Sequence, residues 1–329
     1  MLAALPPGRS EHIVYFGTPE IAVAPLRALV EAGFPIDLVV TGVDKRRGRG
    51  SQTSPSPVKQ AALELGLTVS HDIEDAVKLS AKLLARLSAN TTANSIGMTQ
   101  SNTVGVVVAY GHIIATSVLQ MMPMINIHYS LLPRWRGAAP VERAILAGDK
   151  VTGVCIMQVV EQLDAGDILA SASTPIASSD TVATLRERLG DLAIPLLVQV
   201  LSDGPSTAVA QHGDVVVASK ITSNDLQIDW SQDAQCADRQ VRVGGAFTMM
   251  HNKRLKIHSL NICAPPTSWS TDAAMNTSGA IRVVDGRVLV ACAHGCVELV
   301  EVQPEGKSRI AALDWSLGAR FDTNSRFDS

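Results

Sequence analysis

Residues 13–42 read IVYFGTPEIAVAPLRALVEAGFPIDLVVTG, and this stretch decides the fold. The apolar run at 13–16 is typical of a buried strand, and residues 20–32 have the spacing of a helix that ends at Gly33. The apolar run at 36–42 is typical of a second strand. A strand, a helix and a strand in this order are the unit from which parallel sheets are built. The sequence therefore predicts an α/β protein with an open, mostly parallel sheet.

The apolar segments that follow extend this pattern as far as residue 201. A continuous β-branched run at 104–110 is typical of a strand covered on both faces, and a polar stretch at 88–103 predicts a surface loop. The turn at 17–19 lacks the further glycines of a dinucleotide fingerprint, so we expect no nicotinamide or flavin cofactor. The other predicted elements are helices at 73–87, 138–148 and 181–201 and strands at 125–128 and 152–160.

The pattern changes from about residue 206 onward, where short apolar strands alternate with turn residues. We therefore predict two domains, and the chain is long enough for each to bury its own core. Residues 1–205 form a Rossmann-like domain, and residues 206–329 form a smaller β-rich domain, an OB-like β-barrel. The strands of the second domain are expected within 254–262, 279–293 and 296–302.

The charge balance restricts how the chain could bind a nucleic acid. It has 28 Lys and Arg against 31 Asp and Glu, a net charge of −3, so such binding must use a local basic patch. Residues 206–329 contain 12 Lys and Arg against 13 Asp and Glu, a net of −1, and give no basic surface as a whole. The segment DKRRGRG is a concentrated patch, although most such runs are solvated loops. Its cations are Lys45, Arg46, Arg47 and Arg49.

Cysteine usage and hydropathy favour a cytoplasmic protein. Five scattered cysteines argue against a disulfide framework and for a reducing compartment. The CAHGC stretch at 292–296 has metal-ligand residue types, but it lies between two predicted strands, so we predict a turn rather than a metal site. The first dozen residues lack the apolar core of a signal peptide, and no run of about 18 apolar residues predicts a membrane span.

Chemically useful side chains gather in MINIHYSLLPRWRG at 124–137. Asn126 and His128 are two residues apart on a predicted strand, so an amide donor and an imidazole point to the same face. A carboxylate would complete the set by orienting the imidazole or accepting a proton. The turn LDAGDI supplies Asp164 and Asp167 for this role. Taken singly, these residues are also ordinary turn or core residues.

These motifs carry a family resemblance. The stretch from Asn126 to Leu169, with VVVAYG before it, resembles the folate-dependent formyltransferases, and among them it is most similar to those that act on methionyl-tRNA. Further matches are FGTPEIA at 16–22, GRGSQTSPSPVK at 48–59 and IDW at 228–230. The resemblance runs over most of residues 12–310, is densest at 104–169 and is thinner after 240.

The resemblance implies a reaction and assigns roles to residues. It implies transfer of the formyl group of 10-formyltetrahydrofolate to the α-amine of an aminoacylated initiator tRNA, by a mechanism that needs no metal. We expect the chain to be a monomer. The family's catalytic Asn, His and Asp correspond to Asn126, His128 and Asp164. Its folate-binding SLLP segment corresponds to Ser130, Leu131, Leu132 and Pro133. The basic loop with Lys45, Arg46, Arg47 and Arg49, together with residues 206–329, is the expected tRNA-binding part.

Two other functions remain open at this point. A relative with the same motifs could formylate a small amine, such as glycinamide ribonucleotide or an amino sugar. The fold could also serve as a non-catalytic RNA-binding module, although the intact Asn, His and Asp set argues against this. The sequence departs from the family at Tyr129, where a small residue is usual, and at His112 and Ala115, which replace a leucine and a proline. We expect Tyr129 to point away from His128 because the two are adjacent in a strand.

Overall fold

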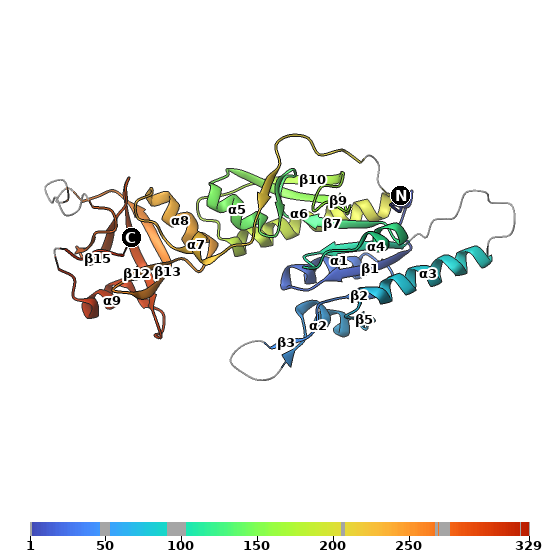
Figure 1. Cartoon of the computed structure of the whole chain (residues 1–329), viewed down its shortest axis with the longest axis horizontal. Coiled ribbons are helices and arrows are strands. Elements are labelled where there is room, and N and C mark those ends of the chain that lie inside the picture. The colour runs from blue at the N-terminus through green and yellow to red at the C-terminus, as the bar shows by residue number, and fades with distance from the viewer. Residues whose placement is uncertain are drawn as a thin grey trace. The chain divides into compact units, whose positions relative to one another are not determined.

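The structure is a computed structural model that describes residues 2–46, 53–90, 103–204, 208–266, 269, 277–322 and 324–328. The chain forms two compact units, drawn in Figure 1 with the chain coloured from blue to red. The first unit contains Met1–Pro140, Val151–Pro175 and Thr184–Ala218. The second contains Val141–Lys150, Ile176–Ala183 and Ser219–Ser329. Residues 206–218 thus group with the first unit, and two short earlier segments group with the second.

The first unit is built on a seven-stranded sheet in the order β10-β9-β7-β6-β1-β2-β5. The five strands from β7 to β5 are parallel, and β9 and β10 are antiparallel additions at one edge. This confirms the predicted open, mostly parallel sheet. The strands are β1 (His12–Gly17), β2 (Ile36–Val40), β5 (Val69–Ser70), β6 (Thr103–Val108), β7 (Met124–His128), β9 (Val151–Gln158) and β10 (Ile168–Pro175).

The sheet is covered on both faces, as the β-branched runs predicted. Every residue of β6 is buried. On one face, Phe16 packs in a cluster with residues of α3 (Ile73–Asn90) and α4 (Thr116–Met121). On the opposite face, the Tyr15 hydroxyl donates a 2.6 Å hydrogen bond to the Ala22 carbonyl. The opening strand therefore alternates its side chains between two cores.

The predicted helices form close to their expected bounds. The predicted helix at 20–32 is a 3-10 turn, η1 (Glu20–Ala22), followed by α1 (Val23–Glu31). Asp72 caps α3, since its Oδ1 accepts 2.9 Å from the Glu74 N–H. Because α3 continues to Asn90, the start of the predicted loop at 88–103 is helical, and 91–102 lie outside the described residues. The other helices of this part of the chain are α2 (Pro57–Glu64), α5 (Pro140–Ala147) and α6 (Val182–Asp203).

Several short strands were not predicted, because only tertiary pairing defines them. β8 (Arg134–Gly137) pairs in parallel with β11 (Val216–Ala218), about 80 residues further along the chain. β3 (Lys45–Arg46) and β4 (Thr53–Ser54) pair antiparallel on either side of residues that the structure does not describe. Strands of two to four residues are too short to show a hydrophobic period of their own.

The second unit contains a six-stranded antiparallel sheet that curls into a half-barrel, in agreement with the predicted β-rich domain. Residues near the C-terminal end pair with two edges of this sheet. Asp328 pairs with Met249, and Arg326 pairs with Ala280. Helices α7 (Ser223–Leu226), α8 (Ala234–Val243) and α9 (Ala312–Ala319) belong to the same unit, as does most of α5. The strands are β12 (Phe247–Met250), β13 (Lys253–Cys263), β14 (Ile281–Val284), β15 (Arg287–Ala291), β16 (Cys296–Pro304) and β17 (Ile310–Ala311).

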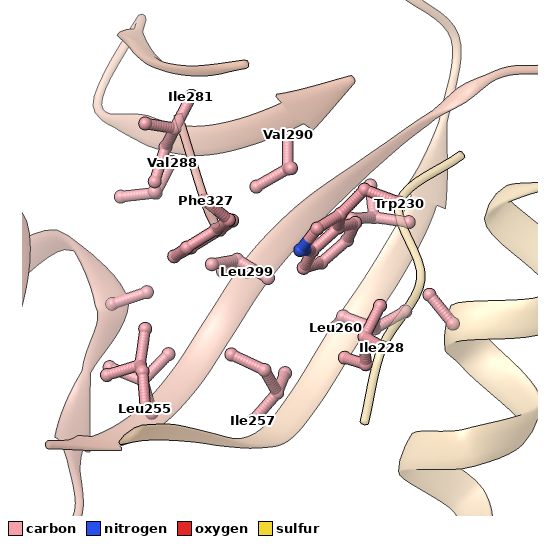
Figure 2. Packing of buried hydrophobic residues seen from close by; sticks show 14 of the residues in the cluster. Ile228, Trp230, Leu255, Ile257, Leu260, Ile281, Val288, Val290, Leu299 and Phe327 are labelled. Carbon is pink, nitrogen blue, oxygen red and sulfur yellow. The ribbon is translucent and has the colours of Figure 1, made fainter. Parts of the chain in front are cut away.

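An aromatic stack fills the interior of this half-barrel. Figure 2 shows Trp230 and Phe327 among aliphatic side chains of the sheet, and their ring centroids are 5.3 Å apart at an interplanar angle of 16°. Trp315 continues the stack at 6.2 Å from Phe327. The indole N–H of Trp230 donates to the Thr248 hydroxyl at 2.9 Å, so the buried polar atom is satisfied. Phe327, which lies between the bridging residues Arg326 and Asp328, therefore anchors this segment in the core.

The CAHGC stretch forms the turn between β15 and β16, as predicted. Gly295 has a φ of +85°, a conformation that favours glycine. Across the described residues, no group of three or more His, Cys, Asp or Glu side chains could hold a metal ion. None of the described helices is long and apolar enough to cross a membrane.

An ion pair joins two helices of the second unit. The Arg143 guanidinium on α5 donates to both oxygens of Asp225 in α7, at 2.6 and 3.1 Å. Asp225 also accepts from the N–H and hydroxyl of Thr222, each at 2.8 Å, in a capping box. The hydrogen bond from Arg143, followed by that from the Thr222 backbone, lowers the pKa of Asp225 to about 2.

We expect Asp225→Asn to lower the free energy of unfolding at pH 7 by about 1 kcal/mol, because it removes a charge-assisted pair. The pKa of Asp225 lies below its unfolded value of about 3.9, so the ionised form stabilises the fold above that pH. The difference between parent and variant should therefore shrink as the pH falls from about 4 towards 2. Urea unfolding at several pH values measures it. Asp285→Asn, in an exposed turn of the same unit, is the control and should leave the free energy of unfolding at pH 7 nearly unchanged.

Candidate active site

Asn126 and His128 lie at the carboxyl end of β7, on the same face of the strand. In the register with β9 they are opposite Met157 and Cys155. The His128 ring is buried, with 4% exposure, whereas Asn126 is partly exposed. The Asn126 amide makes no hydrogen bond with any of the described residues, so its donors are available to a bound atom. The amide and the imidazole are thus brought together as the sequence predicted.

Both ring nitrogens of His128 face protein groups. Nε2 lies 2.8 Å from the Trp135 carbonyl oxygen, and since a carbonyl only accepts, Nε2 carries the hydrogen. Nδ1 lies 3.6 Å from Oδ2 of Asp164, which is longer than a hydrogen bond but within ion-pair range. A neutral Nδ1 and a carboxylate are both acceptors, so their approach is favourable when one proton lies between them. The Asp164 carboxylate is therefore placed beside the ring nitrogen that carries no hydrogen when His128 is neutral.

The partners of His128 come from two backbone segments in the left-handed conformation. Trp135 has a φ of +66° and Asp164 has a φ of +48°. This conformation costs a residue with a side chain about 1 kcal/mol or more. The Gly137 N–H donates to Oδ2 of Asp164 at 2.8 Å, which links the two segments directly. Trp135 and Asp164, the two residues in the left-handed conformation, thus each place an oxygen atom next to the His128 ring.

The turn that carries Asp164 closes tightly onto the end of β9. The Gln158 N–H donates to the Asp167 carbonyl at 2.9 Å. A Cβ at Gly166 would overlap the Gln158 carbonyl oxygen, so only glycine fits the close approach. The Asp167 carboxylate has no partner among the described residues. The structure therefore separates two carboxylates that the LDAGD spacing left equivalent.

The predicted folate segment forms a closed turn. Ser130 is fully buried, and its hydroxyl donates 2.7 Å to the Arg134 carbonyl. The Arg134 N–H donates back to the Leu131 carbonyl at 3.2 Å, and the peptide bond between Leu132 and Pro133 is cis. The Ser130 hydroxyl is thus committed to the turn.

The predicted basic patch is described only at its start. Lys45 is exposed in β3, while Arg47 and Arg49 lie outside the described residues, and only the backbone of Arg46 is described. Lys59 is engaged with Asp44, whose two oxygens accept from its ammonium at 2.9 and 2.8 Å. Of the four predicted cations, only the Lys45 side chain is therefore described.

The sequence did not reveal the groups that hold the two candidate residues in place. The Trp135 carbonyl and the Gly137 N–H are backbone atoms, which no residue type signals. Gln211, which bonds to the Asp164 segment, is 47 residues away along the chain. The departures at His112 and Ala115 lie in an exposed or partly exposed loop, where His112 contacts the Tyr110 ring at 5.0 Å.

An open parallel sheet with an amide, an imidazole and a carboxylate at its carboxyl edge is suited to acid–base group transfer. Sequence comparison specifies the class further. The profile of the formyl transferase family matches residues 11–201, and the profile described as the formyl transferase C-terminal domain matches residues 220–320. The chain belongs to the formyl transferase family, and the resemblance seen in its motifs is confirmed.

Curated relatives match the chain over almost its whole length. One from Methylococcus capsulatus is 38% identical over 92% of this chain and 96% of its own, and one from Jannaschia sp. is 39% identical over 94% and 97%. Both are named methionyl-tRNA formyltransferase.

Solved structures with the same fold are more distant in sequence. The sugar 3N-formyl transferase WlaRD is 15% identical with a TM-score of 0.62, covering 92% of this chain and 100% of its own. HypX from Aquifex aeolicus, in complex with tetrahydrofolic acid, is 14% identical with a TM-score of 0.58, over 94% of this chain and 47% of that one.

Tyr129 lies in the core next to the site. It is 7% exposed, and its hydroxyl has no hydrogen-bond partner among the described residues. Burial raises its pKa. Burial and, secondarily, Tyr129 raise the pKa of Tyr15, whose side chain belongs to the face opposite Phe16. Tyr129 is therefore a packing residue whose hydroxyl is not stabilised.

We expect Tyr129→Phe to raise the free energy of unfolding by about 1 kcal/mol, because it removes an unsatisfied buried hydroxyl. Tyr15→Phe is the matched comparison. It removes a hydroxyl that is bonded to the Ala22 carbonyl, so it should lower the same quantity by about 1 kcal/mol. Denaturant unfolding of both variants measures the difference, and equal effects would show that the Tyr129 hydroxyl has a partner.

Proposed function

We propose that this chain transfers the formyl group of 10-formyltetrahydrofolate to the α-amine of methionyl-tRNA. The observation that carries the proposal is the 38–39% identity to curated methionyl-tRNA formyltransferases over at least 92% of this chain. The match includes the C-terminal domain, and the accessible Asn126 amide beside the His128 and Asp164 pair supports it independently. The enzyme acts as a monomer in the cytoplasm.

The folate co-substrate supplies the formyl group and a nitrogen leaving group. The Asn126 amide has no hydrogen-bond partner among the described residues, so its donors are available to the co-substrate. The turn of Ser130, Leu131, Leu132 and Pro133 holds it. Because the Ser130 hydroxyl is committed to the turn, this segment acts through its backbone and its shape.

The reaction forms one carbon–nitrogen bond and breaks another. The neutral α-amine attacks the formyl carbon, and Asn126 donates a hydrogen bond to the formyl oxygen as it gains negative charge. The amine proton passes to the His128 and Asp164 pair, where it lies between Nδ1 and Oδ2, and is then delivered to the departing folate nitrogen. Nε2 stays bonded to the Trp135 carbonyl and keeps the ring oriented.

The tRNA contacts belong to two parts of the chain. Lys45, Arg46, Arg47 and Arg49 bind phosphates at the basic loop, and residues 206–329, as a domain distinct from the catalytic domain of residues 1–205, add further contacts. The exposure of Lys45 supports the first contact. Because the second domain has a net charge of −1, its contribution depends on placement of individual side chains rather than on overall charge.

Competition between acceptors tests the proposed function. Purified protein is given 10-formyltetrahydrofolate with methionyl-tRNA, glycinamide ribonucleotide and a nucleotide-linked amino sugar in one mixture. We expect formyl transfer to methionyl-tRNA to dominate. Preferred formylation of either small amine would show that the acceptor is not methionyl-tRNA. Binding of tRNA without any formyl transfer would favour a non-catalytic RNA-binding function.

We expect Asn126→Ala to lower kcat by roughly 10²–10³, the usual effect of removing one preorganised donor to a developing oxyanion. The KM for methionyl-tRNA and folate binding should hardly change, because the ground-state carbonyl gains little from this bond. Steady-state kinetics and equilibrium folate binding measure the two quantities. A rate within a few-fold of the parent would remove Asn126 from the mechanism.

The two carboxylates of LDAGD should differ sharply. Asp164→Asn keeps an acceptor for the Gly137 N–H but loses the charge beside Nδ1 of His128, so transfer should fall by at least about 10². Asp167→Asn changes a side chain that has no partner among the described residues, so its rate should stay within about threefold. Single-turnover kinetics of both variants make the comparison. Equal losses in two folded variants would contradict the assignment.

A further inference from the structure

Gln211 uses all four of its hydrogen-bonding positions at the candidate active site. Its Nε2 donates to the Asp164 carbonyl at 2.9 Å and to the Gly166 carbonyl at 2.7 Å. Its Oε1 accepts from Nε and Nη2 of Arg136 at 2.9 and 2.7 Å. Two carbonyls can only accept and a guanidinium can only donate, so the amide has one allowed orientation. The Gln211 side chain is partly buried, and it has no hydrogen-bonding position left for another group.

The two segments that Gln211 joins are those that hold the His128 ring. Arg136 directly follows Trp135, whose carbonyl accepts from Nε2. Asp164 faces Nδ1, and its own carbonyl is one of the two that Gln211 binds. The same amide therefore connects the segment on one side of the imidazole with the segment on the other side.

The backbone around Gln211 is fixed from both directions. Val209 exchanges two backbone hydrogen bonds with Ile168, at 2.8 and 2.9 Å, just after the LDAGD turn. β11 then pairs with β8, which contains Trp135 and Arg136. Backbone pairing on either side thus holds Gln211 in place. Its hydrogen bond can therefore fix the backbone of Asp164, which has a left-handed conformation.

We propose that Gln211 is a positioning residue that sets the place of the Asp164 carboxylate beside Nδ1 of His128. The inference rests on the proposed function, in which this pair carries the proton of the reaction. Because protein groups occupy all four hydrogen-bonding positions of Gln211, it acts on turnover through Asp164 and not on binding. Glutamate has the same shape but no amide hydrogens, and its charge would repel the two carbonyls while keeping the bond to Arg136.

The test compares Gln211→Glu with Gln162→Glu, which makes the same chemical change at an exposed side chain of the Asp164 loop. For Gln211→Glu we expect kcat to fall about 10²-fold, since a displacement of about 1 Å in a reacting group has that effect. Both KM values should stay within about twofold. Gln162→Glu should leave kcat and both KM values unchanged.

A second readout does not depend on formyl transfer. The ¹⁵N shifts of the His128 ring, assigned with His128→Gln, report what each nitrogen faces. In Gln211→Glu, the Nδ1 signal should move while the Nε2 signal, bonded to the Trp135 carbonyl, should move less. If Gln211→Glu does not fold, Gln211→Ala, which lets water reach the two carbonyls, takes its place in both measurements.

The outcomes separate this inference from the proposed function. Loss of kcat with a shifted Nδ1 signal supports the positioning role. Unchanged ring signals in a folded variant, or a rise in KM with kcat unchanged, would overturn it. If the parent protein forms no formyl-methionyl-tRNA, the proposed function fails, and the ring signals alone then decide whether Gln211 positions Asp164.

Discussion

The buried ring of His128, held between one carbonyl and one carboxylate, is the constraint on which the site depends. Burial denies the ring water, so each nitrogen needs a protein partner at a defined place. The Trp135 carbonyl takes the Nε2 hydrogen, which leaves Nδ1 facing Asp164. The hydrogen bond to the Trp135 carbonyl places a hydrogen on Nε2, and the partly exposed Asn126 amide lies one strand period away on the same face.

Meeting this constraint requires two strained residues, Trp135 and Asp164, and the surrounding structure offsets the strain. The Gly137 N–H satisfies the carboxylate, a glycine at 166 allows the turn to close on β9, and Gln211 binds the carbonyl of the strained aspartate. The buried Tyr129 hydroxyl, next to His128 in the sequence, has no hydrogen-bond partner among the described residues.

The second unit solves a different physical problem, which is how to end an open antiparallel sheet. Exposed strand edges invite association with other chains, and here residues 325–328 bridge β12 and the start of β14. Phe327 fixes this bridge by stacking on Trp230 in the core (Figure 2). The half-barrel is thus closed by side-chain burial as well as by backbone pairing.

The sequence by itself determined the parallel sheet, the positions of its main helices and the convergence of Asn126 with His128. Each depends on a local period, the two-residue alternation of a strand or the spacing of a helix, that residues such as Val104–Val108 and Asn126–His128 carry in their own order. The motif resemblance had assigned Asp164, whereas only the tertiary structure showed its Oδ2 facing Nδ1 of His128, revealed the Trp135 carbonyl as the partner of Nε2, and brought Gln211 to the site. These are contacts between segments up to 75 residues apart, made partly by backbone atoms, and no local pattern of residue types encodes them.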